Sequence, residues 1–214
     1  MKNATKHAEE LRSLFKRLMK DHKGHAGATP PQKQDSIRAL VRGILSYDVP
    51  DSKVDDAMSR IEREFVDLNE LRVATELEVI ELLGQRYPDV EHRVEMIVRA
   101  LNAIFEKEHT LNLERMATIS KRDVRQFLRD LPDLHPFADA YVMLMSFDGH
   151  AIPVDDEMLT YLRDHDIVDD KATVADAQRF VEHHVKAEEC HDFYAAFRKA
   201  AQTESGKKKA KAKA

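Results

Sequence analysis

The residue with the clearest capacity for chemistry is Asp155, which follows a short extended segment and precedes a new helical pattern. A carboxylate at a helix N-terminus stays ionised, because the helix dipole favours negative charge there. Such a group can activate an attacking water or stabilise positive charge that develops on a substrate. The position also suits an ordinary N-cap, worth about 1 kcal/mol to a helix. Asp156 and Glu157 stand in the same first turn, so acidity alone does not single out Asp155.

A second group of residues has the spacing of a metal site. His184, Glu188 and His191 fall at positions i, i+4 and i+7, so on one continuous helix they would share a face. Histidine and carboxylate side chains on one face can hold a divalent metal ion. The alternatives are a solvated polar face, or a helix break between His184 and His191. We expect no bound metal, and stoichiometric zinc in the purified protein would be needed to revive this reading.

The elements that position Asp155 form a helix, a tight hairpin and a second helix. Ser120 followed by Asp123 is typical of a helix start, and apolar residues then recur at helical spacing. Pro132 ends that helix, because proline has no N–H and disfavours α conformation in the residue before it. The hairpin is only residues 132–136. The second helix spans about 137–147, and the pair Asp148-Gly149 ends it.

This layout resembles the helix–hairpin–helix DNA glycosylase superfamily, of which endonuclease III is a member. Leu131-Pro132 and Val154-Asp155 stand at the separation of the corresponding pairs in that family. The resemblance covers roughly residues 30–165 and rests mainly on helix order and spacing. It implies an all-α, two-lobed fold that acts in base excision repair by flipping a damaged base out of duplex DNA. It also places the family's catalytic aspartate on Asp155.

The family motif is altered at several positions. Its two hairpin glycines fall on Asp133 and His135, and the Schiff-base lysine of its bifunctional members falls on Phe137. Amine attack needs that lysine, so the resemblance implies a monofunctional glycosylase without lyase activity. The hairpin region would contact DNA through Leu134, His135 and Phe137.

Two further features of the family bear on this sequence. A loop glutamine that enters the duplex in the family matches Asp48 here, which could equally cap the next helix or face water. The iron–sulfur members carry four cysteines, whereas this chain has only Cys190, so no cofactor is expected.

Composition supports an almost all-α protein. The chain has 214 residues, 43% hydrophobic and 34% charged, with six glycines and mostly helical periodicity. No apolar run is long enough to span a membrane. A single cysteine excludes an internal disulfide framework and fits a reducing cytoplasm. We therefore expect a cytoplasmic monomer, associated with the nucleoid if it binds DNA.

The charge is unevenly distributed along the chain. The net charge is −5, but residues 1–206 carry 29 basic against 39 acidic side chains, which is −10. An acidic body argues against strong non-specific binding to DNA, unless its positive residues cluster on one face. The last eight residues hold five lysines, among them Lys207, Lys208 and Lys209. These could bind DNA phosphates or serve only as a solubilising terminus.

The predicted organisation has two lobes and a tail. Residues 31–149 make a central helical bundle that ends in the helix–hairpin–helix. Residues 1–30 and 150–204 make the second lobe, and residues 205–214 a disordered basic tail. The predicted function is base removal from duplex DNA. The alternative is a catalytically inactive relative that acts as a DNA-associated or protein-interaction module.

Overall fold

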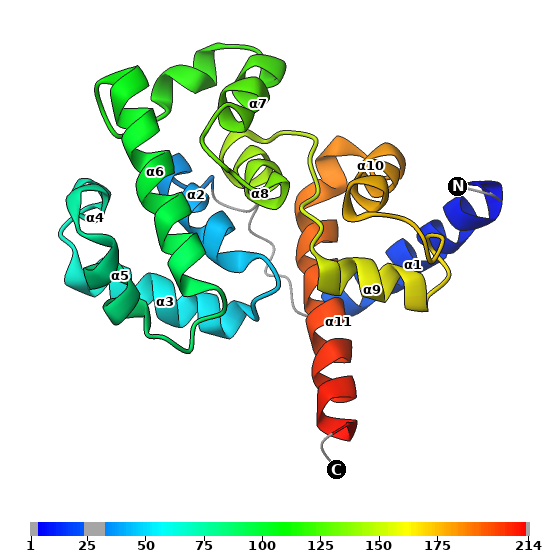
Figure 1. Cartoon of the computed structure of the whole chain (residues 1–214). Coiled ribbons are helices and arrows are strands. Elements are labelled where there is room, and N and C mark those ends of the chain that lie inside the picture. The colour runs from blue at the N-terminus through cyan, green and yellow to red at the C-terminus, as the bar shows by residue number, and fades with distance from the viewer. Residues whose placement is uncertain (1–3, 24–32, 213–214) are drawn as a thin grey trace. The chain divides into compact units, whose positions relative to one another are not determined.

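The computed structural model describes residues 4–23 and 33–212, and these residues are helical and irregular, without a β-strand (Figure 1). The all-α class predicted from the sequence is confirmed. Residues 23–33, whose glycines, adjacent prolines and lack of periodicity predict a linker, lie almost entirely outside the described residues. The chain divides into two compact units: unit 1, residues 1–32 and 150–214, and unit 2, residues 33–149. The sequence prediction had placed these boundaries at 30/31 and 149/150.

Unit 2 is a bundle of seven α-helices and one short 3-10 helix among its described residues. Its core helix α2 packs against α8 and α6, while α7 packs on α8 (Figure 1). At Gly43 a Cβ atom would lie 3.3 Å from Ala138 Cα and 3.3 Å from Tyr141 Cβ, so glycine allows α2 to approach α8 closely. The elements are α2 (Ser36–Ser46), α3 (Asp51–Glu64), α4 (Leu68–Val73), α5 (Glu76–Leu83), α6 (Val90–Glu108), η1 (Glu114–Thr118), α7 (Lys121–Arg129) and α8 (Pro136–Phe147).

Local sequence signals begin several of these helices. Asp35 caps α2 and Ser120 caps α7, each accepting a backbone N–H three residues later. Thr75 and Glu78 form a full capping box at α5. Helix α4, a short helix capped by Asp67, was not predicted from the sequence. Its six residues are too few for helical periodicity to stand out.

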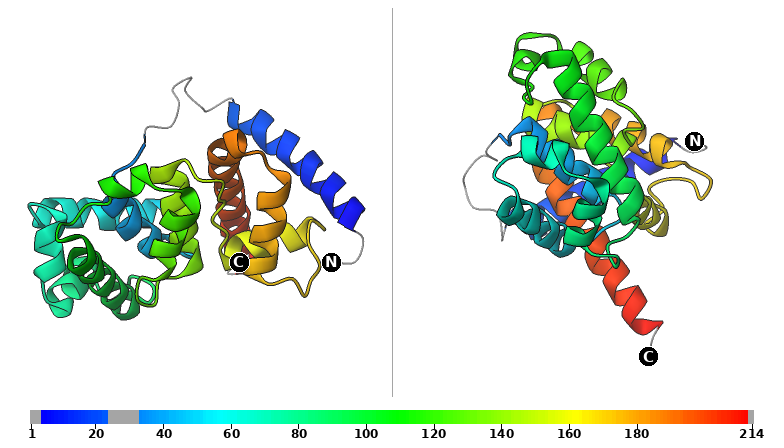
Figure 2. Two further views of the ribbon diagram at one scale, coloured as in Figure 1. Left: turned by 90° about the horizontal axis from the view of Figure 1, so that it is seen from above. Right: turned by 60° about the vertical axis from the view of Figure 1, so that its left-hand side comes forward.

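Unit 1 consists of α1 (Ala4–Lys23), α9 (Asp156–Asp164), α10 (Val174–His184), η2 (Ala187–Glu189) and α11 (Cys190–Lys211). Helix α1 packs against α11 and α10, as the left view in Figure 2 shows. Leu11, Leu14 and Leu18 are buried on one stripe of α1, and the rings of Phe15 and Phe193 stack with centroids 5.6 Å apart. This segregation of apolar side chains is what joins the two ends of the chain into one core.

The last helix differs from its prediction. Helix α11 continues to Lys211, so residues 205–211, predicted to be a disordered tail, are helical. It starts at Cys190, directly after the short 3-10 helix η2. Among the described residues, no helix combines the length and apolar character needed to cross a membrane.

Candidate active site and hairpin

Asp155 is held at the N-terminus of α9. Its Oδ1 accepts the backbone N–H of Met158 at 2.8 Å, so it is the N-cap of that helix. The residue is only 2% exposed, and the preceding Val154 is fully buried. Burial of an ionised carboxylate is unfavourable unless it is paired and hydrogen-bonded. The backbone hydrogen bond satisfies part of that requirement.

Arg198 of α11 satisfies another part. Its Nη1 donates to Asp155 Oδ2 at 3.0 Å, and both side chains are almost completely buried. The guanidinium favours the charged form of the carboxylate and fixes its orientation. The positive charge of the guanidinium also balances the negative charge of the carboxylate, so the ion pair has no net charge. Arg198 was not among the predicted site residues. Its position next to Phe197 and four residues after Tyr194, on the apolar side of a helix, is nevertheless a recognisable signal of a buried ion pair.

The hairpin between α7 and α8 uses its own polar groups. His135 is the N-cap of α8, and its Nδ1 accepts the N–H of Phe137 at 3.2 Å. The carbonyl of His135 accepts the N–H groups of Ala138 and Asp139, and Pro136 has no N–H to offer. These first-turn donors, which could otherwise bind an anion, are thus engaged within the hairpin.

The altered glycine position carries backbone strain and charge. Asp133 adopts φ +52°, the left-handed region that glycine tolerates best. Its carboxylate forms an ion pair with Arg99 at 2.6 Å. Asp133 therefore adopts a backbone conformation that favours glycine and places a negative side chain in the turn.

The loop between α2 and α3, residues 47–50, lies beside this hairpin in unit 2. The rings of Tyr47 and His135 have centroids 4.0 Å apart. Arg93 donates to the carbonyls of Ile44 at 2.5 Å and Tyr47 at 2.7 Å, which fixes the end of α2. Burial lowers the pKa of Arg93, and nearby groups only partly oppose that shift. Asp48 stands exposed at φ +51° in this rigid loop.

No protein-family model matches this chain, and no curated protein sequence matches it significantly. Comparison with solved structures is decisive for the fold. A trapped endonuclease III–DNA covalent intermediate matches with a TM-score of 0.71 at 14% identity, covering 89% of this chain and 84% of that one. The chain has the DNA glycosylase fold.

Other structures with this fold match over similar lengths. An 8-oxoguanine glycosylase/lyase from Clostridium acetobutylicum, in complex with double-stranded DNA, has a TM-score of 0.69 at 16% identity, with coverages of 95% and 71%. The H. pylori 3-methyladenine DNA glycosylase bound to 1,N6-ethenoadenine has a TM-score of 0.69 at 13% identity, with coverages of 92% and 97%. Identities this low establish the glycosylase fold and leave the activity to be argued from the site.

The predicted DNA contact of Phe137 conflicts with the position of this side chain in the structure. Phe137, predicted to contact DNA, is 1% exposed and packs edge-on against Tyr47. Its ring is part of the core of unit 2, so this side chain is not accessible to DNA. Leu134 and His135 remain half-buried at the hairpin.

The lysines of the predicted tail are engaged with α9. Lys208 forms ion pairs with Asp164 and Glu204, and Lys209 pairs with Glu157 at 3.2 Å. Lys207 is exposed on the same helical extension. Exposed pairs of this kind contribute little stability, so phosphate could compete for these lysines.

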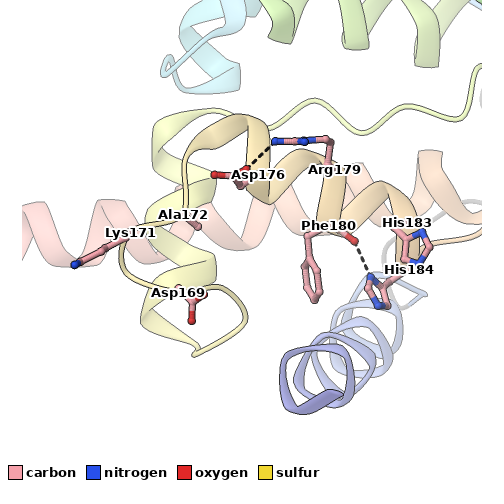
Figure 3. Close-up of a pocket in the computed structure, with 8 residues that line it drawn as sticks. All are labelled: Asp169, Lys171, Ala172, Asp176, Arg179, Phe180, His183 and His184. Carbon is pink, nitrogen blue, oxygen red and sulfur yellow. Dashed lines mark hydrogen bonds and ion pairs between the residues drawn. The ribbon is translucent and has the colours of Figure 1, made fainter. Parts of the chain in front are cut away.

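The three residues with metal-site spacing are separated by a helix break. Helix α10 ends at His184 and α11 begins at Cys190, so His184, Glu188 and His191 do not share one helix. The Nδ1 of His184 instead lies 2.8 Å from the carbonyl of Phe180 (Figure 3). No group of three His, Cys, Asp or Glu side chains suited to a metal ion occurs within residues 4–23 and 33–212. A helix break between His184 and His191 was one of the two alternatives that the sequence left open.

His184 also lines an open cavity of about 460 Å³ within unit 1. Figure 3 shows Phe180 at its centre, with Arg179 and Asp176 paired above it. Its lining mixes both charges, and its acidic and basic residues largely pair with each other or cap helices. It is lined by Asp169, Lys171, Ala172, Asp176, Arg179, Phe180, His183 and His184.

Proposed function

We propose that this protein is a DNA glycosylase of base excision repair that hydrolyses the N-glycosidic bond of a damaged or mismatched base in duplex DNA. The observation that carries the proposal is the fixed carboxylate of Asp155 at the start of α9, within a glycosylase fold. Base loss builds positive charge on the sugar, which an ionised carboxylate stabilises. The same carboxylate can activate the attacking water.

Arg198 acts in this proposal as a positioning residue. Its guanidinium, 3.0 Å from Asp155 Oδ2, holds the carboxylate in one orientation and keeps it ionised. It also offsets part of the negative charge that would stabilise the sugar cation. We therefore expect the fastest excision for bases whose bond to the sugar is already weakened.

The proposed reaction stops at an abasic site. Phe137 stands where the bifunctional members of the family place their lysine, and an aromatic ring cannot form a Schiff base. We propose that the protein acts as a monomer on nucleoid DNA in the cytoplasm. Its DNA contacts would come from Leu134 and His135 at the hairpin and from the lysines at the end of α11.

Single-turnover base release tests this function. The substrates are duplexes with alkylated, oxidised, deaminated or mismatched bases, followed by hot alkali to cut abasic sites. We expect excision by the wild type, strand breaks only after alkali, and at least a hundredfold slower excision by Asp155→Asn. The matched control is Asp156→Asn, which removes an exposed carboxylate one residue away. Equal excision by wild type and Asp155→Asn would refute the assignment.

A second function is favoured by two observations. The first-turn N–H donors of α8 are engaged by His135, and Arg198 neutralises Asp155. Both are what a catalytically inactive relative would tolerate, one that serves as a DNA-associated or protein-interaction module. Duplex binding without excision of any base in the panel would select this alternative.

A further inference from the structure

Exposed apolar side chains gather at one place on unit 2, around α4 and α5. The large hydrophobic residues that stand exposed in the described parts of the chain are Val66 at 93%, Val73 at 66% and Leu77 at 63%. All three fall within twelve residues of sequence. Scattered apolar residues are normal on a surface, but a cluster of them marks an interaction site.

Val73 lines an open groove of about 580 Å³ between the end of α3 and the helices α4 and α5. Val66 and Leu77 directly follow and precede two other lining residues, Phe65 and Glu78, in the sequence. Half-buried Phe65 and Leu82 give the groove an apolar floor, which continues to exposed Val73. A cavity of this size holds one or two anchoring side chains of a partner. The groove is built wholly within unit 2, and it is lined by Glu64, Phe65, Glu70, Val73, Ala74, Glu78, Glu81 and Leu82.

The rim of the groove is strongly acidic. Residues 62–81 contain seven Asp and Glu against two Lys and Arg, a net charge of −5. Glu64 and Glu81 form no ion pair with any other described residue, while Glu70 and Glu78 accept hydrogen bonds from Val66 and Thr75. The two arginines are used elsewhere, since Arg63 bonds the carbonyl of Ser59 and Arg72 bonds Asn102 and lies over Phe105.

The charge of the rim decides what can occupy the groove. Phosphate is repelled by uncompensated carboxylates, so this surface is not a DNA contact. Three or more metal-ligating side chains do not converge in the described residues, which removes a metal ion as the occupant. Lysine and arginine side chains complement the rim, and aliphatic side chains complement the floor.

We propose that the α4–α5 groove docks a basic segment of a partner protein, anchored by one or two aliphatic side chains in the groove. This interaction goes beyond base removal and does not depend on it. Apolar anchors supply affinity and the carboxylate rim selects for positive charge. The binding should weaken as salt rises, because the rim is exposed.

The test measures binding of a fluorescent eighteen-residue amphipathic peptide of leucine and lysine to the full-length protein by anisotropy. A leucine–glutamate peptide of the same pattern and an all-lysine peptide are the comparison probes. We expect binding of the leucine–lysine peptide at least tenfold tighter than either. If the leucine–glutamate peptide binds equally well, charge selection is absent and the proposal fails.

Variants then locate the binding surface. Glu64→Lys with Glu81→Lys, and separately Val73→Ser with Leu77→Ser, should each weaken binding about tenfold, as loss of about 1.4 kcal/mol implies. The matched control is Glu91→Lys with Glu106→Lys, which makes the same charge change at exposed positions of α6. Equal effects of the groove and control variants would overturn the site.

Sedimentation equilibrium decides between a foreign partner and a second copy. A monomer at all concentrations, together with peptide binding at the groove, supports the proposal. A concentration-dependent dimer that Glu64→Lys with Glu81→Lys abolishes would show instead that the groove holds basic residues of another copy.

Discussion

Asp155 and Arg198 show how one buried pair serves both stability and the proposed chemistry. Each side chain would be costly to bury alone, and the pair is tolerable because hydrogen bonds complete it. The ion pair joins α9 to α11 through residues 43 positions apart. Its two roles can be separated, because stability is measured without DNA.

Removing one member of this pair should be much more destabilising than breaking an exposed pair. We expect Asp155→Ala to lower the free energy of unfolding by about 3–5 kcal/mol, since the buried guanidinium of Arg198 loses the carboxylate that pairs with it. Glu62→Ala, which breaks the half-exposed Arg38–Glu62 pair, should cost about 0–1 kcal/mol. Urea denaturation measures both. Equal costs would mean that Asp155 is exposed to water in solution.

Cys190 offers a second prediction about a single residue. Burial, with lesser contributions from three nearby glutamates, raises the pKa of its thiol to about 12. The residue is fully buried, and its Sγ lies 3.3 Å from the carbonyl of Lys186. We expect no reaction with Ellman's reagent at pH 8 in the native protein, and complete reaction in denaturant. Rapid native labelling would contradict this burial.

The same shift predicts a pH dependence of folding. The unfolded thiol ionises near its ordinary pKa of 9, while the folded thiol keeps its proton up to about 12. The unfolded state is therefore favoured progressively as pH rises from 9 to 12. Cys190→Ala should show a shallower loss of stability than the wild type across this range. Parallel slopes would mean that the thiol ionises equally in both states.

At the scale of the element, helix contacts depend on the size of the smallest residues. Gly43 lies where α2 meets α8, and an added methyl group would lie 3.3 Å from Ala138 Cα and from the Cβ of Tyr141. Gly206 lies on α11 with no atom within 4 Å of the position of an added Cβ. The two glycines therefore make a matched pair.

Alanine at these two positions should have opposite effects. Gly43→Ala should destabilise the protein by about 1–3 kcal/mol through overpacking. Gly206→Ala should raise helix content at 222 nm and stabilise by up to about 1 kcal/mol, because alanine favours a helix over glycine. An unchanged circular dichroism signal for Gly206→Ala would indicate that residues 205–211 are not helical in solution.

At the scale of the molecule, the two units differ in charge and in chain continuity. Residues 33–149 contain 16 Lys and Arg against 23 Asp and Glu, a net charge of −7, while the rest of the chain carries +2. The net positive charge of unit 1 comes from the five lysines of residues 207–213. Unit 2 is one continuous segment, whereas unit 1 joins residues from both ends of the sequence.

Continuity makes unit 2 the part that can fold independently. We expect a fragment of residues 33–149 to unfold cooperatively in urea, because α2, α6 and α8 bury a core of their own. A fragment of residues 150–214 should be unfolded, since it lacks Leu11, Leu14 and Leu18 of α1. Far-ultraviolet circular dichroism measures both. A folded 150–214 fragment would show that α1 is dispensable.

Much of the fold followed from local sequence. Ser120 caps the helix that it was expected to begin, and Asp35, Thr75 and Thr173 cap helices in the same way. Capping and helical periodicity involve residues three or four apart, so the sequence displays them directly. The short helix α4 and the extension of α11 to Lys211 were not anticipated, because neither has a strong apolar pattern. In α11, Lys208 and Lys209 contact acidic residues of α9, which no local pattern reveals.

The sequence by itself determined the helical class, the positions of most helix starts, and Asp155 as a carboxylate at the head of a helix. The tertiary structure decided what that carboxylate meets, which is Arg198 of a distant helix. It also decided that Phe137 is buried, that His184 and His191 lie on different helices, and that exposed Val73 lines an acidic groove. The physical reason is range. Hydrogen bonds along a helix are encoded within a few residues, whereas charge pairing, burial and surface clustering depend on which distant segments pack together.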